Sequence, residues 1–262
     1  MSGPSAVVAR DLTRRVAHVM GMPISLAMDG RHARTPAGER AWADAFASLQ
    51  EADSVFSTYW EDSVISRLGR GAIALDDCPE VVHEVLALAE VARAESGGAF
   101  DVWRKGPDGV IALDPSGIVK GWAVDRAADY LRQLDETDFC LSAGGDMVCA
   151  TARAESPDWR VGIEDPRDPA QVLAAVPIRN GAIATSGFAH RGEHIVDPRT
   201  DETPRTFASV TVIAETLSAA DVDATAAFVL GEEGPGWMSG RRHRSAFFVR
   251  GDGTILSVPS VG

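Results

Sequence analysis

Apolar residues recur at helical spacing in four stretches of the chain. The clearest example is the stripe of Val82, Val85 and Ala89, in which each residue lies three or four positions after the one before it. Gly97 or Gly98 would supply the left-handed residue at which that helix ends. The same spacing predicts helices over residues 39–56, 79–98, 117–134 and 217–231.

Shorter apolar runs rich in β-branched residues predict strands between and after these helices. Residues 14–30 form the first such run, and residues 245–258 read as a terminal hairpin that turns at 251–253. Because the strands of the second half follow one another with little helix between them, the pattern favours an α+β fold over a doubly wound sheet. The remaining predicted strands cover residues 138–143, 147–151, 159–164, 172–178, 182–186, 194–198 and 209–215.

The size and composition of the chain predict one folded unit. It has 262 residues, and 45% of them are hydrophobic, so it can bury a full core. No low-complexity linker, internal repeat or long run of charge marks a boundary between domains. We therefore expect residues 1–262 to form a single domain.

The charge of the chain excludes one large class of partners. The formal net charge is −13, and Lys and Arg are not concentrated in any segment, whereas contacts to nucleic-acid phosphates need clustered basic residues. The sequence therefore predicts no nucleic-acid partner. It also has no apolar stretch long enough to span a membrane and no unbroken segment of signal-peptide length near its start. We expect a cytoplasmic protein without a membrane segment.

The three cysteines do not form a recognisable metal or redox motif. Cys78, Cys140 and Cys149 are odd in number and show neither CxxC nor zinc-like spacing. Cys140 and Cys149 lie in apolar runs that are predicted as strands. We therefore expect these two to be buried free thiols.

Candidate chemistry is concentrated between residues 180 and 231. Asp221 and Thr225 are four positions apart in a predicted helix, so both side chains lie on one face and can offer oxygens to one hard cation. Thr185 lies in a turn of small residues, and His194 leads into an Asp-Pro turn. Each has a structural alternative: Asp221 could complement a helix dipole, Thr225 could be an ordinary helical threonine, and His194 could be a hydrogen-bonded structural residue.

Three glycine-containing segments elsewhere would let the backbone approach a ligand. Gly97–Asp101 follows a predicted helix, Ala143–Asp146 leaves a predicted strand, and Lys120–Gly121 is expected where a helix opens, so that a cation and free N–H groups could meet a phosphate. A helix C-cap, a tight turn and a solvated lysine would explain the same residues. The chain contains neither GxxxxGK[ST] nor GxGxxG, which argues against a P-loop and the usual dinucleotide fold.

Eight short motifs follow one another along the chain: Met-Gly at 20–21, STYWEDSVISRL at 57–68, GGAFD at 97–101, KGWAVD at 120–125, AGGD at 143–146, TSG at 185–187, HIVDP at 194–198 and ADVDATAAFVLG at 220–231. In this order they resemble the ApbE family, the FAD:protein FMN transferases, over nearly the whole chain. The resemblance implies an α+β fold with mixed or antiparallel sheets, flanking helices and an FAD cleft between its two halves.

The resemblance also implies an activity. Family members use Mg²⁺ to move FMN from FAD to a Thr or Ser hydroxyl of an acceptor protein through a phosphoester bond, and they release AMP. The implied cofactor is Mg²⁺, FAD is the substrate, and the partner is a flavin-accepting protein. Two alternatives would use the same pocket: a Mg²⁺-dependent FAD pyrophosphatase that yields FMN and AMP, and an FAD-binding protein without turnover.

The resemblance assigns roles to particular residues. His194 would be the catalytic residue near the reacting phosphate and the base for the acceptor hydroxyl, a duty that Asp101 or Asp146 could share. The implied metal ligands are the backbone carbonyl of Ala128 and the side chains of Asp221 and Thr225. These are the oxygen donors that Mg²⁺ prefers. The implied FAD-binding residues are Met20, Tyr59, Ala99, Phe100, Asp101, Lys120, Asp125 and Thr185.

Some features depart from the family pattern. Met22 stands where a threonine usually follows Met-Gly, and Gly69 occupies a position commonly taken by asparagine; neither belongs to the implied metal site. Residues 102–113 form a shorter segment than in most members, which would reshape the rim of the pocket and the docking of the acceptor. Many members also carry an export signal, which is not expected here.

Overall fold

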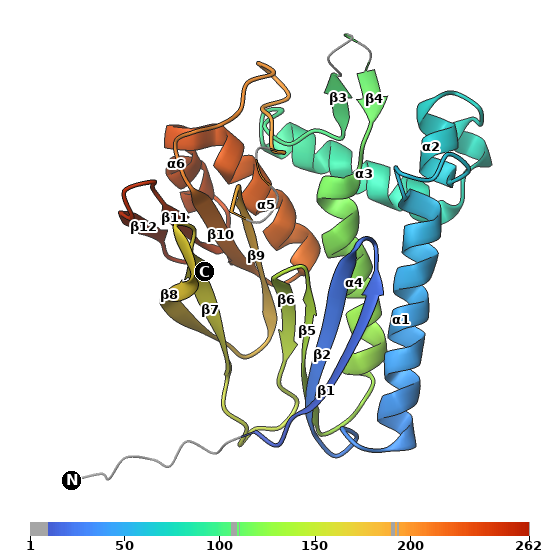
Figure 1. Ribbon diagram of the computed structural model, residues 1–262, viewed down its shortest axis with the longest axis vertical. Coiled ribbons are helices and arrows are strands. Elements are labelled where there is room, and N and C mark those ends of the chain that lie inside the picture. The colour runs from blue at the N-terminus through green and yellow to red at the C-terminus, as the bar shows by residue number, and fades with distance from the viewer. Residues whose placement is uncertain (1–9, 106–108, 110, 190–191, 193, 262) are drawn as a thin grey trace.

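The protein is built on one eight-stranded sheet (Figure 1). The computed structural model describes residues 10–105, 109, 111–189, 192 and 194–261. Neighbouring strands are antiparallel throughout the sheet, and their spatial order is β1-β2-β5-β6-β9-β10-β11-β12. These strands are β1 (Thr13–Val19), β2 (Met22–Gly30), β5 (Thr137–Ala143), β6 (Asp146–Ala150), β9 (Gly181–Gly187), β10 (Ser209–Ala214), β11 (Ser245–Val249) and β12 (Ile255–Val258).

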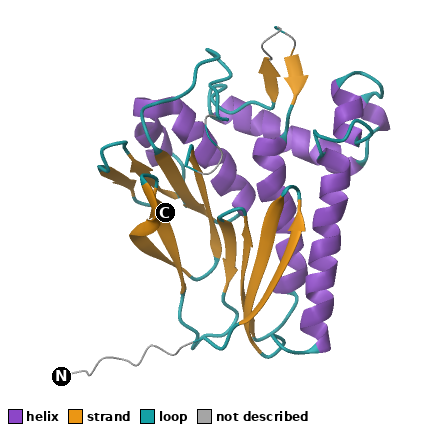
Figure 2. Cartoon of the chain, in the orientation of Figure 1, coloured by secondary structure: helices purple, strands orange, loops and turns teal. Residues whose placement is uncertain are grey.

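Helices lie against one face of this sheet (Figure 2). The α4 and α5 helices pack against its central strands, and α1 packs on α4. Helices segregated to one face of an antiparallel sheet define the α+β class, so the predicted fold class is confirmed. The helices are α1 (Pro36–Phe56), α2 (Val64–Gly69), α3 (Glu80–Glu95), α4 (Ser116–Arg132), α5 (Leu217–Leu230) and α6 (Gly234–Ser239), with short 3₁₀ turns at Leu75–Asp77 and Gly231–Glu233.

Two hairpins stand apart from the main sheet. The short pair β3 (Trp103–Lys105) and β4 (Ile111–Leu113) projects above the helices in Figure 1. The longer pair β7 (Trp159–Asp165) and β8 (Asp168–Ile178) covers part of the sheet face opposite the helices. There it forms a second, smaller hydrophobic cluster with side chains of the central strands.

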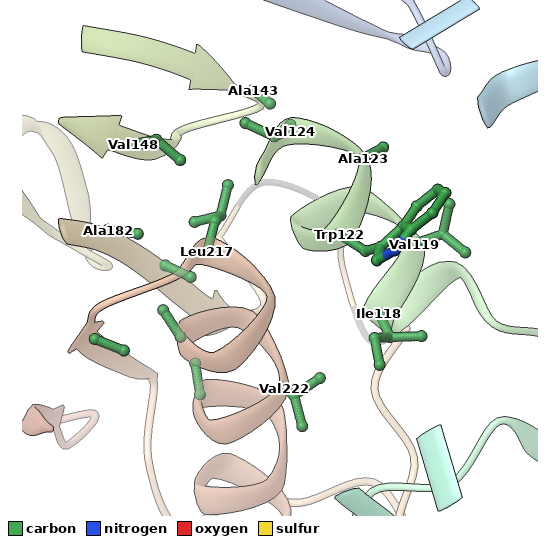
Figure 3. Packing of buried hydrophobic residues seen from close by; sticks show 14 of the residues in the cluster. Ile118, Val119, Trp122, Ala123, Val124, Ala143, Val148, Ala182, Leu217 and Val222 are labelled. Carbon is green, nitrogen blue, oxygen red and sulfur yellow. The ribbon is translucent and has the colours of Figure 1, made fainter. Parts of the chain in front are cut away.

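The larger hydrophobic core lies between the helices and the sheet. Figure 3 shows Val124 of α4 and Leu217 of α5 beside Val148 and Ala182 of the sheet, with Ile118 further along α4. All five side chains are buried, and the removal of such apolar surface from water is the main favourable contribution to folding. This core fixes α4 and α5 on neighbouring strands.

A single glycine sets the closest approach of these two helices. A Cβ atom at Gly121 would lie 2.7 Å from the Cα of Ser218 and 2.8 Å from the carbonyl oxygen of Leu217, well inside the normal contact distance. Only a residue without a side chain therefore allows α4 and α5 to pack in this register. The contact brings Lys120, the residue before Gly121, next to α5.

The long helices and most strands agree with the sequence pattern. The α3 helix ends at Glu95, and Gly97 and Gly98 follow with φ of +60° and +82°, as expected for a glycine C-cap region. The α1 helix begins three residues before the predicted start because the Thr35 side chain accepts a hydrogen bond from the Gly38 N–H and Pro36 occupies the first turn. The terminal hairpin is confirmed as β11 and β12.

Three predicted elements differ from the structure. The run over residues 14–30 is two strands rather than one, because Met20 and Gly21 adopt φ of +55° and +70° and close a hairpin. The helix expected to open near Lys120 begins at Ser116, whose N–H is bound by the Asp114 side chain at 3.1 Å. Lys120 thus lies in the second turn, away from the free N–H groups of the helix start.

Residues 194–198 do not form the predicted strand. Asp197 turns the chain locally: its carboxylate accepts hydrogen bonds from the backbone and side chain of Arg199, and its N–H donates to the Glu202 carbonyl. The Arg199 guanidinium also lowers the pKa of Asp197. These local bonds replace a strand ladder. Over the residues that the structure places, no helix is both long and apolar enough to cross a membrane.

Candidate active site

A cavity of about 270 Å³ lies where α4, α5 and the central strands meet the loops above them. Its wall brings together segments that are far apart in the sequence, including the loop after α3, the β5–β6 turn and the end of β9. Eight of the twelve predicted site residues line it: Ala99, Phe100, Asp101, Lys120, Thr185, His194, Asp221 and Thr225.

A buried charge cluster forms one side of the cavity. The Lys120 ammonium lies 2.5 Å from Asp146 Oδ2 and 3.2 Å from Asp221 Oδ1, and all three side chains are largely buried. Burial opposes the charge on Lys120, but the two carboxylates outweigh this cost and raise the pKa of the ammonium. Lys120 therefore stays protonated and cannot act as a base at neutral pH.

The β5–β6 turn positions Asp146. Gly144 and Gly145 both have positive φ, +58° and +102°, which is the conformation of a two-residue type I′ hairpin. A Cβ on Gly145 would meet no atom within 4 Å, so the backbone conformation and not lack of space requires glycine there. Asp146 follows the turn, and its Oδ1 accepts a hydrogen bond from the Thr185 N–H at 2.9 Å.

Hydroxyl groups continue the polar wall from β9 to α5. The Ser186 hydroxyl lies 2.9 Å from the Thr225 hydroxyl, and the Thr185 hydroxyl lies 2.8 Å from that of Thr211 on β10. Ser186 and Thr225 are therefore fixed beside Asp221, which lies one helical turn before Thr225. Ser186, Asp221 and Thr225 thus line the cavity with oxygen atoms from β9 and α5.

His194 lies in the loop above this wall. Its Nδ1 is 2.9 Å from the Gly192 carbonyl oxygen, and because a carbonyl can only accept, this contact requires a proton on Nδ1. In the neutral ring Nε2 is then the nitrogen with a lone pair, so it can take up a proton. Arg104 holds the same loop by donating to the His194 carbonyl at 3.2 Å, and it also contacts Asp114 at 3.4 Å.

An apolar wall completes the cavity. Ala99 and Phe100 are buried, and the Phe100 N–H donates to the Ser96 hydroxyl at 3.0 Å, which ties the loop to the end of α3. Asp101 Oδ1 accepts from the Trp103 N–H at 2.9 Å, so this carboxylate also shapes the local turn. The cavity thus has one apolar side and one charged side.

Four predicted site residues lie outside this cavity. Met20 is in the β1–β2 turn, where its N–H donates to Asp53 at 3.3 Å, and Tyr59 is 94% exposed on the loop before α2. Ala128 is buried in α4, two turns beyond Lys120 and about 12 Å further along the helix axis. Its carbonyl is therefore not placed to share a cation with the side chains of α5.

Asp125 has a structural role in the fold. It lies outside the cavity, and its two carboxylate oxygens accept hydrogen bonds from the Leu217 and Ser218 N–H groups at 2.9 and 2.8 Å. These N–H groups belong to the first turn of α5, where no intrahelical acceptor exists. Burial raises the pKa of Asp125, although both hydrogen bonds act in the opposite direction.

We expect the Asp125→Ala substitution to lower stability. Loss of both acceptors leaves the N–H groups of buried Leu217 and half-buried Ser218 unsatisfied at the start of α5, which should reduce the free energy of unfolding by about 1–3 kcal/mol. Thermal unfolding of the purified variant measures the effect. Asp129→Ala on the exposed side of the same helix, where Asp129 forms an exposed ion pair with Arg132, is the control and should leave Tm nearly unchanged. An unaltered Tm for Asp125→Ala would contradict the assignment.

Several cavity residues escaped prediction. Three of them lie at the start of α4: Asp114, Ser116 and Gly117. The Asp-Pro-Ser sequence at this point is typical of a helix start and could have indicated it. Arg104 lies on a strand too short to show a periodic pattern. Ser209 on β10 is buried, and its hydroxyl has no hydrogen-bond partner within the described parts of the chain. No sequence signal distinguishes it from a core serine.

The residues present fit a magnesium ion in part. Asp221 and Thr225 both line the cavity from one face of α5, as their spacing predicts, and they offer a carboxylate and a hydroxyl, which are hard oxygen donors of the kind that Mg²⁺ takes alongside water and phosphate oxygens. The third predicted ligand, the Ala128 carbonyl, does not fit. A cation at this wall would lie close to Lys120, so it requires an anionic ligand to balance the added charge.

Comparison with known proteins identifies relatives of this chain. Residues 103–248 match the model of the ApbE family. The FAD:protein FMN transferase of Haemophilus influenzae is 33% identical over 134 residues, which cover 47% of this chain and 39% of that protein. The FAD:protein FMN transferase of Rhodobacter capsulatus is 34% identical over 161 residues, covering 58% and 30%. The chain thus spans well under half of the length of these relatives.

Solved structures share the fold over nearly the whole chain. The ApbE protein of Thermotoga maritima superposes with a TM-score of 0.81 at 21% identity and covers 94% of this chain and 96% of that one. The flavin transferase ApbE of Vibrio cholerae gives a TM-score of 0.80 at 22% identity, with coverage of 96% and 98%. The architecture of these proteins is therefore the architecture of this chain.

Proposed function

Because the chain belongs to the ApbE family, we propose that it is a magnesium-dependent FAD:protein FMN transferase. In this reaction the whole FMN part of FAD is transferred, through its phosphate, to a Thr or Ser hydroxyl of an acceptor protein, and AMP is released. One observation carries the proposal: Lys120, Asp146, Asp221, Thr225 and His194 line a single cavity. The names of relatives support the reaction type, and the cavity supplies groups suited to phosphoryl transfer.

The charged wall would receive the diphosphate of FAD. Asp221 and Thr225 would hold Mg²⁺, which supplies neutralisation of the phosphate charge and orients the phosphate oxygens. Lys120 adds a permanent positive charge at the same wall, and its contacts to Asp146 and Asp221 fix both carboxylates. Phosphoryl transfer depends chiefly on such positioning and charge stabilisation.

His194 would act on the acceptor hydroxyl. With Nδ1 held on the Gly192 carbonyl, Nε2 takes the hydroxyl proton as the oxygen attacks the FMN phosphorus. The bond between that phosphorus and the bridging oxygen of the diphosphate breaks, and AMP leaves with the bridging oxygen. His194 is exposed, as access by a side chain of another protein requires.

The apolar wall of Ala99 and Phe100 would pack against a ring of FAD. Asp101, next to this wall, would then accept hydrogen bonds from the ligand with the carboxylate oxygen that the Trp103 N–H leaves available. In this arrangement the aromatic part of the substrate and its diphosphate occupy opposite sides of the cavity.

Ser209 supplies a test of FAD contact at the cavity wall. Its buried hydroxyl has no partner among the placed residues, so a ligand that bonds to it would gain about 0.5–1.5 kcal/mol. Ser209→Ala should therefore weaken FAD binding about 2- to 10-fold without lowering Tm. Titration of protein into FAD, followed by flavin fluorescence in the presence of Mg²⁺, measures the affinity.

The control for this measurement is Ser239→Ala. Ser239 is an exposed serine on α6 that donates to the Gly236 carbonyl and does not line the cavity, so its loss should leave FAD affinity unchanged. Equal affinities for the Ser209 variant and the parent protein would remove Ser209 from the binding site.

FAD binding that depends on magnesium tests the proposed site as a whole. We expect FAD to bind in the presence of Mg²⁺, and its affinity to fall by at least about tenfold when a chelator removes the cation. Without the cation, the diphosphate and the carboxylates of Asp146 and Asp221 repel one another. Absence of binding under both conditions would contradict the proposed function.

A further inference from the structure

Two thiols face one another on neighbouring strands of the central sheet. Cys140 on β5 is paired with Cys149 on β6, and their sulfur atoms are 3.7 Å apart. In a two-residue hairpin the residues flanking the turn form a hydrogen-bonded pair, here Ala143 and Asp146. Because the two kinds of pair alternate along the ladder, the cysteines form a non-hydrogen-bonded pair.

This position suits a cross-strand disulfide. Non-hydrogen-bonded pairs have Cα atoms about 4.5 Å apart and side chains close together, and disulfides occur at Cα separations of about 4.4–6.8 Å. The sulfur atoms of Cys140 and Cys149 therefore need only side-chain rotation and a small approach of the strands to bond. Cys78, the third thiol, is buried in the other hydrophobic cluster and bonds to the Ala74 carbonyl at 3.5 Å.

The two thiols are chemically unequal. Cys149 is buried and donates its S–H to the Cys140 sulfur, whereas Cys140 is half-buried. This hydrogen bond lowers the pKa of Cys140, and the nearby Arg14 and Arg10 side chains act in the same direction against the effect of burial. The same contact and burial raise the pKa of Cys149. Cys140 is thus the more accessible and the more readily ionised thiol, which are the properties of an attacking sulfur.

The pair lies on the side of the sheet away from the charge cluster. Both cysteines belong to the cluster that the β7–β8 hairpin covers, whereas Asp146 contacts Lys120 of α4 on the helix side. Cys149 nevertheless follows Asp146 by three residues on β6. A covalent link at this position would join β5 to β6 directly below the Gly144–Gly145 turn without entering the cavity.

We propose that Cys140 and Cys149 form a reversible modification site, which a low-molecular-weight disulfide such as oxidised glutathione converts into an intrachain disulfide. The Cys140 thiolate attacks one sulfur of glutathione disulfide, forms a mixed disulfide and releases one glutathione thiolate. Cys149 then gives up its proton and attacks the Cys140 sulfur, which expels the second glutathione thiolate. Two protein thiols are oxidised, one glutathione disulfide is reduced, and the two protons lost by the cysteines protonate the two glutathione thiolates.

The disulfide restrains the hairpin that carries Asp146. A cross-link within a short loop removes conformational freedom mainly from the unfolded chain, so the oxidised protein should unfold at a Tm higher by roughly 5 °C. This effect depends only on the β5–β6 ladder and stands whichever ligand the cavity takes.

The test is incubation of the native, folded chain of 262 residues with oxidised glutathione, followed by alkylation of the remaining thiols and peptide mass analysis. Before alkylation we expect a protein lighter by two hydrogen atoms. After alkylation in denaturant, digestion should yield a linked peptide pair containing Cys140 and Cys149, with Cys78 alkylated. A reducing agent should restore the original mass and the original Tm. The Cys149→Ser variant should stop at the mixed disulfide on Cys140, because no second thiol can expel glutathione.

Three results would overturn the proposal. The first is that Cys140 and Cys149 are both still free thiols, and are fully alkylated, after prolonged incubation of the native protein with oxidised glutathione. The second is a mixed disulfide with glutathione that persists on Cys140 of the parent protein. The third is a disulfide between two chains. Cys78→Ser is the matched control, since it removes the thiol that is distant from the pair and should leave the linked peptide unchanged.

Discussion

The Asp221→Asn variant should lose about 1000-fold or more in the rate of FMN transfer. The substitution keeps the shape of the side chain but removes the charge that would hold Mg²⁺ beside Thr225, and charge stabilisation of this kind contributes several kcal/mol to phosphoryl transfer. It also leaves Lys120 with Asp146 as its remaining carboxylate contact in the cluster. Rates measured over a range of Mg²⁺ concentrations should show a higher cation requirement as well as a lower maximum.

Asp223 provides the matched control for Asp221. It is a buried carboxylate on the same helix, but it pairs with Arg241 and Arg244 and does not line the cavity. Asp223→Asn should therefore reduce stability, because it weakens a buried ion pair, while the dependence of the rate on Mg²⁺ stays the same. If the two variants lose activity equally at temperatures where both are folded, Asp221 has no special role in catalysis.

The His194→Ala variant should transfer FMN about 10²- to 10⁴-fold more slowly, with FAD affinity and Tm close to those of the parent protein. Removal of a general base has this magnitude. His194 is an exposed loop residue, and its Nδ1 hydrogen-bonds to the Gly192 carbonyl. Single-turnover measurements with saturating FAD separate the loss in the chemical step from any change in binding.

His18 is the control for this second variant. It is an exposed histidine on β1, at the edge of the sheet opposite β12. His18→Ala should behave like the parent protein in both rate and affinity. Transfer by His194→Ala at the parental rate would show that another group, such as Asp101 or Asp146, takes the hydroxyl proton.

The sequence predicts local features of this protein better than contacts between elements. The spacing of Asp221 and Thr225 places both on one face of α5, because helix geometry alone decides it, and both do line the cavity. The salt bridges of Lys120 could not be predicted in this way. They depend on the close packing of α4 against α5 at Gly121, and only the tertiary structure reveals that a side chain there would collide with Ser218.

Two residues that the family resemblance assigns to the site, Asp125 and Ala128, lie outside the cavity. Asp125 and Ala128 lie on α4 with Lys120, but residues five and eight positions further along the helix are about 7 and 12 Å away along its axis. Asp125 therefore reaches the N–H groups of α5 instead of the cavity. Asp114, at the opposite end of α4, lines the cavity, and its role as a helix-start residue could have been recognised from the Pro and Ser that follow it.

Local hydrogen bonds explain the other differences. Apolar residues in HIVDP suggest a strand, but the Asp197 carboxylate binds the Arg199 backbone and side chain and bends the chain. The β3 and β4 strands contain three residues each, which is too few for alternation to be visible. The β3 strand carries Arg104, which holds the loop with His194 at the cavity, so the rim of the site was the least predictable part.

The most direct test of the account combines the purified chain, FAD and Mg²⁺ with a flavin-accepting domain that carries the target threonine. We expect fluorescent flavin bound covalently to the acceptor, AMP in equal amount, and no labelling when the threonine is replaced by valine. Release of AMP and FMN without labelling of the acceptor would indicate hydrolysis, and absence of both products would leave only binding; either result would contradict transferase activity.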